Sequence, residues 1–321
     1  MRLKSLSNFF PMVKRIKSFF SILKRAFHGF IEDNAFKLSA SLSYYTVFSL
    51  GPLLIIIISL AGIFYRKEAV QGTVYAQLQG LVGSDAAAQI QEIIKNIGHT
   101  DQNMMGVIAG VVILVIGATG VFIEMQDSIN YIWSVKAKPK KGWLKFLINR
   151  LLSFSLIISM GFLLLVSLIV SALLDMLSGR LSKYFADVTL YVFYALNLVV
   201  ILLVISCLFA VIFKILPDAY IRWKDAFIGA GFTAILFLLG KIGIGYYIGR
   251  SNLGLTYGAA ASIIIILTWI YYSSLILYFG AEFTKMYALK RGGGIKPDRT
   301  AVFIIKKESS EAPDGYTFPK E

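Results

Sequence analysis

Long stretches without a charged residue dominate this chain and restrict what it can fold into. Five such runs occupy Leu38–Tyr65, Gln102–Ile123, Leu151–Leu174, Val188–Phe213 and Ser251–Ala281. A sixth follows Asp225 and extends to Tyr247, interrupted by the charge of Lys241 alone. A bilayer core of about 30 Å is crossed by a helix of about 20 apolar residues. The sequence therefore predicts an all-α, polytopic membrane protein with six transmembrane helices.

Composition supports a membrane protein and argues against several other classes. Hydrophobic residues make up 57% of the chain and charged residues only 16%, whereas soluble domains carry about 25% charged residues. The net charge of +14 lies in basic residues beside the spans, which favours anionic lipid headgroups over nucleic acid as the partner. Two distant histidines and one cysteine argue against a zinc site or an intrachain disulfide. We expect no cofactor.

The charge pattern divides the chain into three parts. Residues 1–36 are expected to form a cytoplasmic basic amphipathic helix, and residues 288–321 a flexible cytoplasmic tail rich in Gly, Pro, Lys, Glu and Ser. Residues 37–287 form the transmembrane domain, with spans at about 38–64, 105–125, 150–174, 189–213, 225–247 and 257–283. The loop between the first two spans shows helical spacing of apolar residues. It is predicted to form short helices that cover the outer ends of the spans.

Residues 12–31 have the pattern of an interfacial helix. Phe20, Leu23 and Phe27 recur at helical spacing, while Lys17 and Lys24 belong to the polar side. Such a helix suits the surface of an anionic leaflet. It equally suits a helix docked on the protein's own cytoplasmic face, and the two interpretations are compatible.

The distribution of Lys and Arg predicts the orientation. With the N-terminus inside, 24 of the 32 Lys and Arg residues fall in cytoplasmic segments and 6 on the opposite side. Cytoplasmic loops carry the excess of positive charge in membrane proteins. We therefore expect a multi-pass protein of the bacterial inner membrane with both termini in the cytoplasm. The sequence leaves homo-oligomer formation open.

Lys241 is the first candidate functional residue because an ammonium inside a span is costly. At 1.5 Å per residue it lies roughly 24 Å beyond Asp225, in the outer part of the membrane. Three interpretations stay open. The side chain reaches the outer headgroups, faces a polar cavity, or pairs with Asp175 or Asp187.

A second group of candidates gathers near the cytoplasmic ends of the spans. A polar network there, with Arg150 and Lys285 at similar depth, would either line a pathway or form a structural ring of ion pairs. Its candidate members are Glu124, Asp127, Asn130, Glu282, Arg222 and Asp225. Further pathway candidates are Tyr45, Pro52, Asn252 and Tyr257, although packing is the commoner role for aromatic side chains in such positions.

Several segments, taken in order, resemble one family. They are SASLSYYTVFSLGPLL, DSINYIW, LPD followed by RWKDAFIGA, YGAAASIIIILTWIYYSS and GAEFTKMY. Together they resemble the YihY/BrkB family of bacterial inner-membrane proteins, which implies six transmembrane helices with both ends cytoplasmic. Some family members were labelled ribonuclease BN. Metal-assisted phosphodiester hydrolysis needs a cluster of His and carboxylate ligands, which this sequence lacks, so we predict neither a ribonuclease nor another enzyme.

Two functional hypotheses remain. The first is a transporter or channel-like protein for a lipid, an anionic amphiphile or a small solute. The second is a membrane scaffold that organises the envelope without transporting anything. A membrane-embedded enzyme is the weakest alternative, and its candidate residues would be Glu124 and Asp127.

Overall fold

The computed structural model describes residues 3–64, 88, 91, 120–138, 186–250, 261–291 and 293–306. Most of these residues are helical. The long helices are α1 (Leu3–Glu32), α2 (Ala35–Phe64), α7 (Ala186–Ile215), α8 (Trp223–Arg250) and α10 (Ala261–Lys290), and residues 120–132 add a shorter helical segment. The strands are β1 (Val135–Ala137), β2 (Ala219–Tyr220), β3 (Lys296–Pro297) and β4 (Ala301–Phe303).

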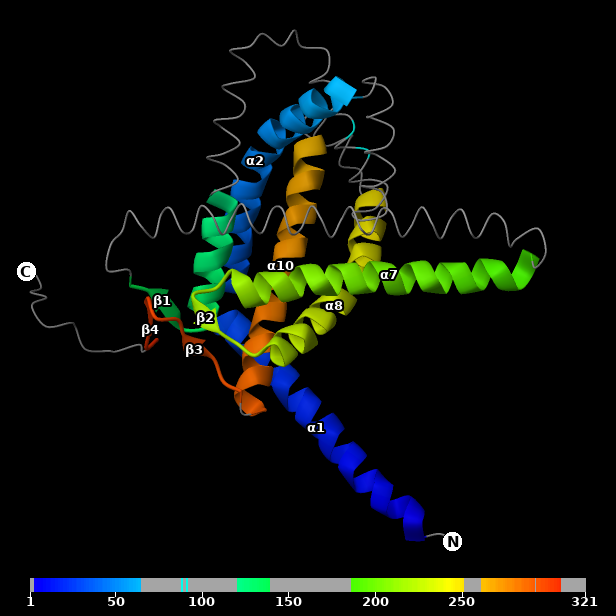
Figure 1. The fold of residues 1–321 in the computed structure, drawn as a ribbon, viewed down its shortest axis with the longest axis vertical. Coiled ribbons are helices and arrows are strands. Elements are labelled where there is room, and N and C mark those ends of the chain that lie inside the picture. The colour runs from blue at the N-terminus through cyan, green and yellow to red at the C-terminus, as the bar shows by residue number, and fades with distance from the viewer. Residues whose placement is uncertain are drawn as a thin grey trace, which may run out of the picture.

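Helix α10 is the centre of the described structure. It contacts α1, α2 and α8, while α7 packs mainly against α8. Figure 1 shows α2 and α10 side by side and α7 running across their direction. Helix α1 leaves the lower end of this group toward the N-terminus.

Two glycine–threonine pairs bring α8 and α10 into close contact. A Cβ atom at Gly229 of α8 would overlap Thr284 of α10, and one at Gly280 of α10 would overlap Thr233 of α8. Both hydroxyls are satisfied within their own helices. Thr233 Oγ1 donates to Gly229 O at 2.7 Å and Thr284 Oγ1 to Gly280 O at 2.6 Å. The pairs form a reciprocal Gly-x-x-x-Thr contact, the kind of small-residue interface that lets membrane helices approach closely.

Two short antiparallel sheets lie together at one end of the helices, which we call the strand end (Figure 1). In the first, β1 pairs with β4 in the register Val135↔Phe303; in the second, β2 pairs with β3 in the register Ala219↔Pro297. The C-terminal segment 293–306 therefore pairs with two loops that are distant in sequence. The strand end also holds the turn between α1 and α2, where Asn34 adopts a left-handed φ of 51°.

The ordered segment 293–306 differs from the flexible tail that the sequence predicts. The Gly and Pro residues of this segment argue against a helix, but composition does not reveal the contacts that order it. The stabilising contacts are long-range: Asp298 N donates to Asp218 O at 2.9 Å, and Ile304 N donates to Ser134 O at 2.9 Å. Residues 307–321 lie outside the described part of the chain.

The long helices cover the predicted spans 38–64, 189–213 and 225–247, and the predicted span 257–283 from residue 261 onward. Three stretches of the described helices are long and apolar enough to cross a membrane: Ala195–Ile215, Trp223–Ile248 and Ile263–Lys290. The predicted span 105–125 is described only from residue 120, where the helix continues to 132. The predicted span at 150–174 lies outside the described residues, as do nearly all of the loop residues 66–105.

The apolar contacts form one large cluster and two smaller ones. The large cluster fills the strand end around Ile129, Trp133, Phe213 and Tyr278. A second joins α8 to α10 through Ile244, Ile248, Ile265 and Trp269, and a third joins α1 to α10 through Ile22, Ala26 and Phe283. The core thus positions the turn after α1, the segment 120–132 and the end of α10 against one another.

Candidate functional site

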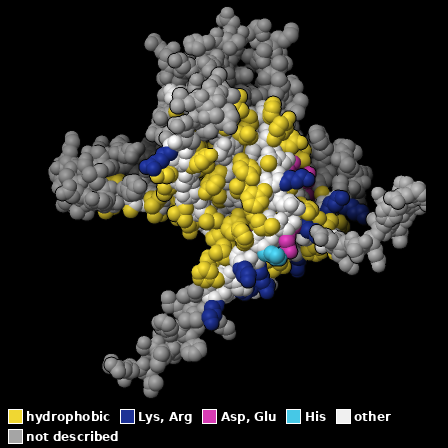
Figure 2. Space-filling view, turned by 180° about the vertical axis from the view of Figure 1, so that it is seen from behind, with side chains coloured by type: hydrophobic (Ala, Val, Ile, Leu, Met, Phe, Trp, Pro, Cys, Tyr) yellow, Lys and Arg dark blue, Asp and Glu magenta, His cyan; other side chains and the backbone are white. Residues whose placement is uncertain are grey.

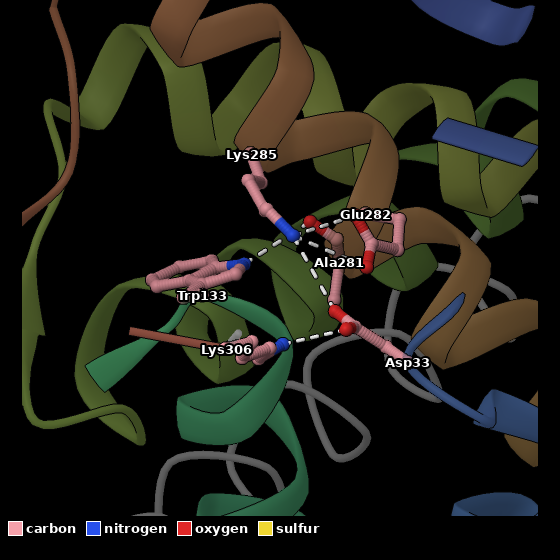
Figure 3. Close-up of polar contacts among 6 residues, drawn as sticks. All are labelled: Asp33, Trp133, Ala281, Glu282, Lys285 and Lys306. Atoms are coloured by element: carbon pink, nitrogen blue, oxygen red, sulfur yellow. Dashed lines mark hydrogen bonds and ion pairs between the residues drawn. The ribbon is translucent and has the colours of Figure 1, made fainter. Parts of the chain in front are cut away.

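The candidate site is a cluster of four charged side chains at the strand end, shown in Figure 3. Asp33 comes from the turn between α1 and α2, Glu282 and Lys285 from α10, and Lys306 from the segment after β4. Lys285 Nζ lies 3.4 Å from Asp33 Oδ2 and 3.2 Å from Glu282 Oε2. Lys306 Nζ lies 2.6 Å from Asp33 Oδ1. The contacts connect three separate parts of the chain.

The cluster is deeply buried. The side chain of Glu282 is 0% exposed, that of Asp33 6%, and that of Lys285 14%. A Cβ atom at Gly29 would lie 2.9 Å from Glu282 Oε2, so this glycine leaves the space that the carboxylate occupies. Beside the cluster, Trp133 Nε1 donates a hydrogen bond to Ala281 O at 3.1 Å (Figure 3). The indole thereby fixes the adjacent turn of α10.

The cluster sets two carboxyl groups against two ammonium groups. Removing such groups from water costs several kcal/mol per ion, and close pairing offsets that cost only when the geometry is good. Burial lowers the pKa of Lys306, and its contact with Asp33 offsets this effect only in part. The ion pairs hold the tail against the turn after α1, at an energetic cost that apolar side chains would avoid.

A second polar contact attaches the segment 120–132 to the loop before α8. Asn130 Nδ2 donates to Asp218 Oδ2 at 2.8 Å, and the backbone N of Asp218 donates to Asn130 Oδ1 at 2.8 Å. Gln126 Nε2 donates to the same carboxylate oxygen at 3.3 Å. This reciprocal arrangement explains why an aspartate follows the proline of the Leu-Pro-Asp sequence.

The tail also passes over a third polar pair, at the start of α8. Arg222 Nε donates to Asp225 Oδ2 at 2.9 Å, and this contact raises the pKa of Arg222. A Cβ atom at Gly293 would overlap both side chains. A glycine at this position therefore lets the tail backbone cross directly over the ion pair.

A pocket of about 670 Å³ opens beside the charge cluster. Within its lining, Lys306 Nζ lies over the Tyr131 ring, 4.0 Å from the ring centre. The pocket is lined by Glu32, Asp33, Asn34, Tyr131, Ile304, Ile305 and Lys306. Asp33 and Lys306 of the cluster thus border a space that reaches the molecular surface.

The predicted network members fall into separate contacts. Glu282 belongs to the charge cluster, Asn130 to the contact with Asp218, and Asp225 to the pair with Arg222. Glu124 accepts a hydrogen bond from Ser128 Oγ at 3.4 Å. Asp127 is exposed on the same helical segment. The described residues thus place these candidates in separate contacts, and a pathway or a ring of ion pairs stays a prediction.

The remaining candidates lie elsewhere. Lys241 is half-buried on α8, away from the strand end, and its neighbour Gly240 packs against Tyr272 of α10. The ring of Tyr45 packs over Gly120, and Pro52 lies within α2, which continues to Phe64. The candidates Asn252 and Tyr257 are outside the described residues.

Two members of the charge cluster could not be selected from the sequence. Asp33 follows Glu32 in an ordinary-looking helix end, and Lys306 belongs to a basic tail. The sequence offers one weak signal, and only for Asp33, which is an acidic residue shortly before an apolar span in a region otherwise rich in basic residues. Among the described residues, no three His, Cys, Asp or Glu side chains are grouped so that they could hold a metal ion.

The fold and its surface define the class of protein. Large apolar side chains are exposed along the long helices, including Val192, Leu203, Leu239, Ile242 and Ile263. Figure 2 shows a broad band of hydrophobic side chains, with Lys and Arg along its lower margin. An exposed apolar surface of this extent is typical of a helical membrane protein.

Comparison with known proteins identifies the family. The model of the family described as Virulence factor BrkB matches residues 26–303, and the chain belongs to this family. The resemblance seen in the sequence is thus confirmed.

Among the relatives is a UPF0761 membrane protein of Ralstonia nicotianae, 28% identical over 82% of this chain and 57% of its own length. A second relative, from Saccharophagus degradans, is 28% identical over 96% of this chain and 69% of its own length. A third, from Pseudoalteromonas atlantica, is 27% identical over 83% of this chain and 86% of its own length. The chain thus spans little more than half of the Ralstonia relative. These names describe membrane proteins and attach no enzymatic activity to them. No solved structure matches the chain.

Proposed function

We propose that this protein moves an anionic amphiphile or a small anionic solute across the inner membrane, and that it is not an enzyme. The charge cluster acts as a gate at the cytoplasmic end of the pathway. The observation that carries this proposal is the burial of Glu282 with Asp33, Lys285 and Lys306. The four groups come from the turn after α1, the end of α10 and the tail that follows α10.

Burial of these charged groups favours a role of the cluster as a switch over a purely structural role. A buried ion pair is seldom more stabilising than apolar packing of the same volume, and switching is one of its better-attested uses. Ionisable groups buried in membrane proteins commonly mark substrate or ion pathways. Separation of the tail from Asp33 would leave Lys285 as the remaining cation and would open the adjacent pocket. A change of about 1.4 kcal/mol in the free energy of the closed state relative to the open state shifts the ratio of open to closed protein about tenfold.

Lys241 supplies the argument for an anionic substrate. It lies on α8, half-buried, three residues before Ile244 of the contact with α10. A cation in the outer part of the membrane suits an anionic headgroup or carboxylate. Reaching the outer headgroups is the competing role for the same side chain.

The proposed orientation places the strand end in the cytoplasm. The four segments that the charge count assigns to the cytoplasm, 1–36, 126–150, 214–224 and 284–321, all contribute described residues to this end. Their meeting at one end is what alternating spans require. The excess of Lys and Arg in these segments then sets the direction.

Transport by purified protein tests the proposal. The full chain is reconstituted into liposomes, and movement of a fluorescent anionic phospholipid is followed by dithionite quenching, in parallel with efflux of a small anionic dye. The wild type is expected to move one of the two probes faster than protein-free liposomes. Lys241→Met is expected to abolish the movement and Lys241→Arg to retain part of it. Movement of neither probe would contradict the proposal.

The gate has its own test in the same assay. Glu282→Gln weakens the closed state and is expected to raise probe movement. Lys224→Gln alters an exposed charged side chain outside the pocket lining and is expected to leave the rate unchanged. Equal rates for Glu282→Gln and wild type would show that the cluster does not control access.

The scaffold remains the second candidate, favoured by the exposed apolar side chains of α1, such as Phe20 and Phe27. Deletion of residues 1–31 would not separate the two functions, because Ile22 and Ala26 are buried against α10. Phe20→Ser with Phe27→Ser leaves this contact intact and removes the exposed rings. A scaffold is expected to lose its cellular function with these substitutions, whereas a transporter is expected to keep probe movement in liposomes.

A further inference from the structure

Helix α1 has three distinct faces between Lys17 and Glu32. The first is covered by the protein: Ile22 and Ala26 are buried against Phe283 of α10, and Lys290 Nζ donates to Ser18 O at 3.0 Å. This contact fixes both the position and the rotation of the helix. Docking on the protein's own surface, one of the two interpretations of the sequence, thus accounts for one face only.

The second face is apolar and exposed. Phe20 is 63% exposed, Phe27 59% and Ile31 47%. Their spacing of seven and four residues places them along one line of an α-helix. We call this line the apolar strip. No described segment covers it, and three large apolar side chains in a row are unfavourable in water.

The third face is basic and directly adjacent. Lys17, Lys24 and His28 are exposed and repeat the same spacing of seven and four. Each precedes a member of the apolar strip by three residues, which places the basic line about 60° around the helix from the strip. A line of basic side chains beside a line of large apolar side chains is the pattern of an interfacial helix on an anionic leaflet.

The connection to α2 places the strip at the right depth. Asp33 and Asn34 alone separate the two helices, and the uncharged run of α2 begins at Leu38. The bilayer boundary therefore lies near the first turns of α2, beside the last turn of α1.

We propose that residues 17–32 of α1 form a binding surface for anionic phospholipid headgroups. The apolar strip enters the acyl boundary of the leaflet, and Lys17 and Lys24 contact the headgroup phosphates. Because Asp33 follows directly, lipid binding to α1 also positions the carboxylate that receives Lys285 and Lys306. The proposal concerns membrane attachment and does not depend on transport.

Site-directed labelling of the full chain tests the surface. Cys207 is the one cysteine of the sequence, so Cys207→Ser provides a background for Phe27→Cys and His28→Cys, each carrying a nitroxide. Both variants are reconstituted into liposomes with and without phosphatidylglycerol in a phosphatidylcholine membrane. Collision with oxygen reports the acyl region, and collision with a water-soluble nickel chelate reports the aqueous phase. A label at 27 is expected to favour oxygen, and one at 28 the nickel chelate.

Lipid charge separates this surface from other partners. With phosphatidylglycerol present, the label at 27 is expected to move deeper, and Lys17→Gln with Lys24→Gln is expected to cancel that shift. Nickel contact at 27 equal to that at 28 would overturn the proposal. Shielding of the label at 27 from both reagents would indicate a protein partner and would also overturn the proposal. A depth of this label that depends neither on phosphatidylglycerol nor on the two lysines would do the same.

Discussion

Removal of Lys285 is the sharpest test of how the charge cluster is held together. Lys285 Nζ lies within 3.4 Å of Asp33 and 3.2 Å of Glu282. Lys306 contacts Asp33 at 2.6 Å, but its ammonium makes no described ion pair with Glu282. In Lys285→Met, the 0% exposed carboxylate of Glu282 therefore loses the cation that pairs with it among the described residues.

The expected loss of stability follows from that geometry. Breaking a buried ion pair by removing one partner costs about 3–5 kcal/mol, because the remaining charge stays buried. At about 2 °C per kcal/mol for a large domain, the unfolding midpoint in detergent should fall by roughly 6–10 °C. Replacing both charges, in Glu282→Gln with Lys285→Met, removes the uncompensated carboxylate and should recover most of the loss.

Thermal unfolding followed by tryptophan fluorescence measures these shifts, since Trp133 is buried next to the cluster. Glu32→Gln is the matched control, because its carboxylate is exposed and forms a surface contact with His28. Its midpoint should equal that of the wild type. The reasoning is refuted if Lys285→Met lowers the midpoint no more than Glu32→Gln, or if adding Glu282→Gln gives no recovery.

Two further predictions concern the contacts that position the site. Gly229→Ala should destabilise the protein, because the added Cβ atom overlaps Thr284. Gly231→Ala adds a Cβ atom that meets nothing within 4 Å, so it should be neutral or stabilising by up to about 1 kcal/mol. Equal thermal unfolding midpoints for the two variants would contradict the close helix contact. Asn130→Ala removes both hydrogen bonds to Asp218 and should cost about 2–4 kcal/mol. Urea unfolding in detergent measures that loss, and a cost below that of an exposed substitution would contradict the role of Asn130.

The helices could be read from the sequence because their signal is local. Uncharged runs of membrane length predict where α2, α7, α8 and α10 lie. The bounds of α2, α7 and α8 agree within three residues, whereas α10 continues to Lys290, seven residues beyond the predicted end. The amphipathic pattern likewise identifies α1. Each of these signals depends on neighbouring residues along one helix, so no knowledge of tertiary contacts is needed.

The site could be predicted only in part because its contacts join distant segments. Glu282 stood out as a carboxylate at the end of a span, and Asn130 as a polar residue on an apolar segment. The residues Asp33, Lys306 and Asp218 did not stand out, since the contact of Lys306 with Asp33 and that of Asp218 with Asn130 span 273 and 88 positions. The strands at 296–303 escaped prediction for the same reason, because two- and three-residue strands have no periodicity of their own.

The central claim is that the contact between the tail and the turn after α1 must open during transport. In a Cys207→Ser background, Asp33→Cys and Lys306→Cys are joined by a short bifunctional thiol reagent in the reconstituted protein, and probe movement is measured before and after cleavage of the link. The linked protein is expected to stop moving the probe and to recover when the link is cleaved. Unchanged movement in fully linked protein would contradict the claim.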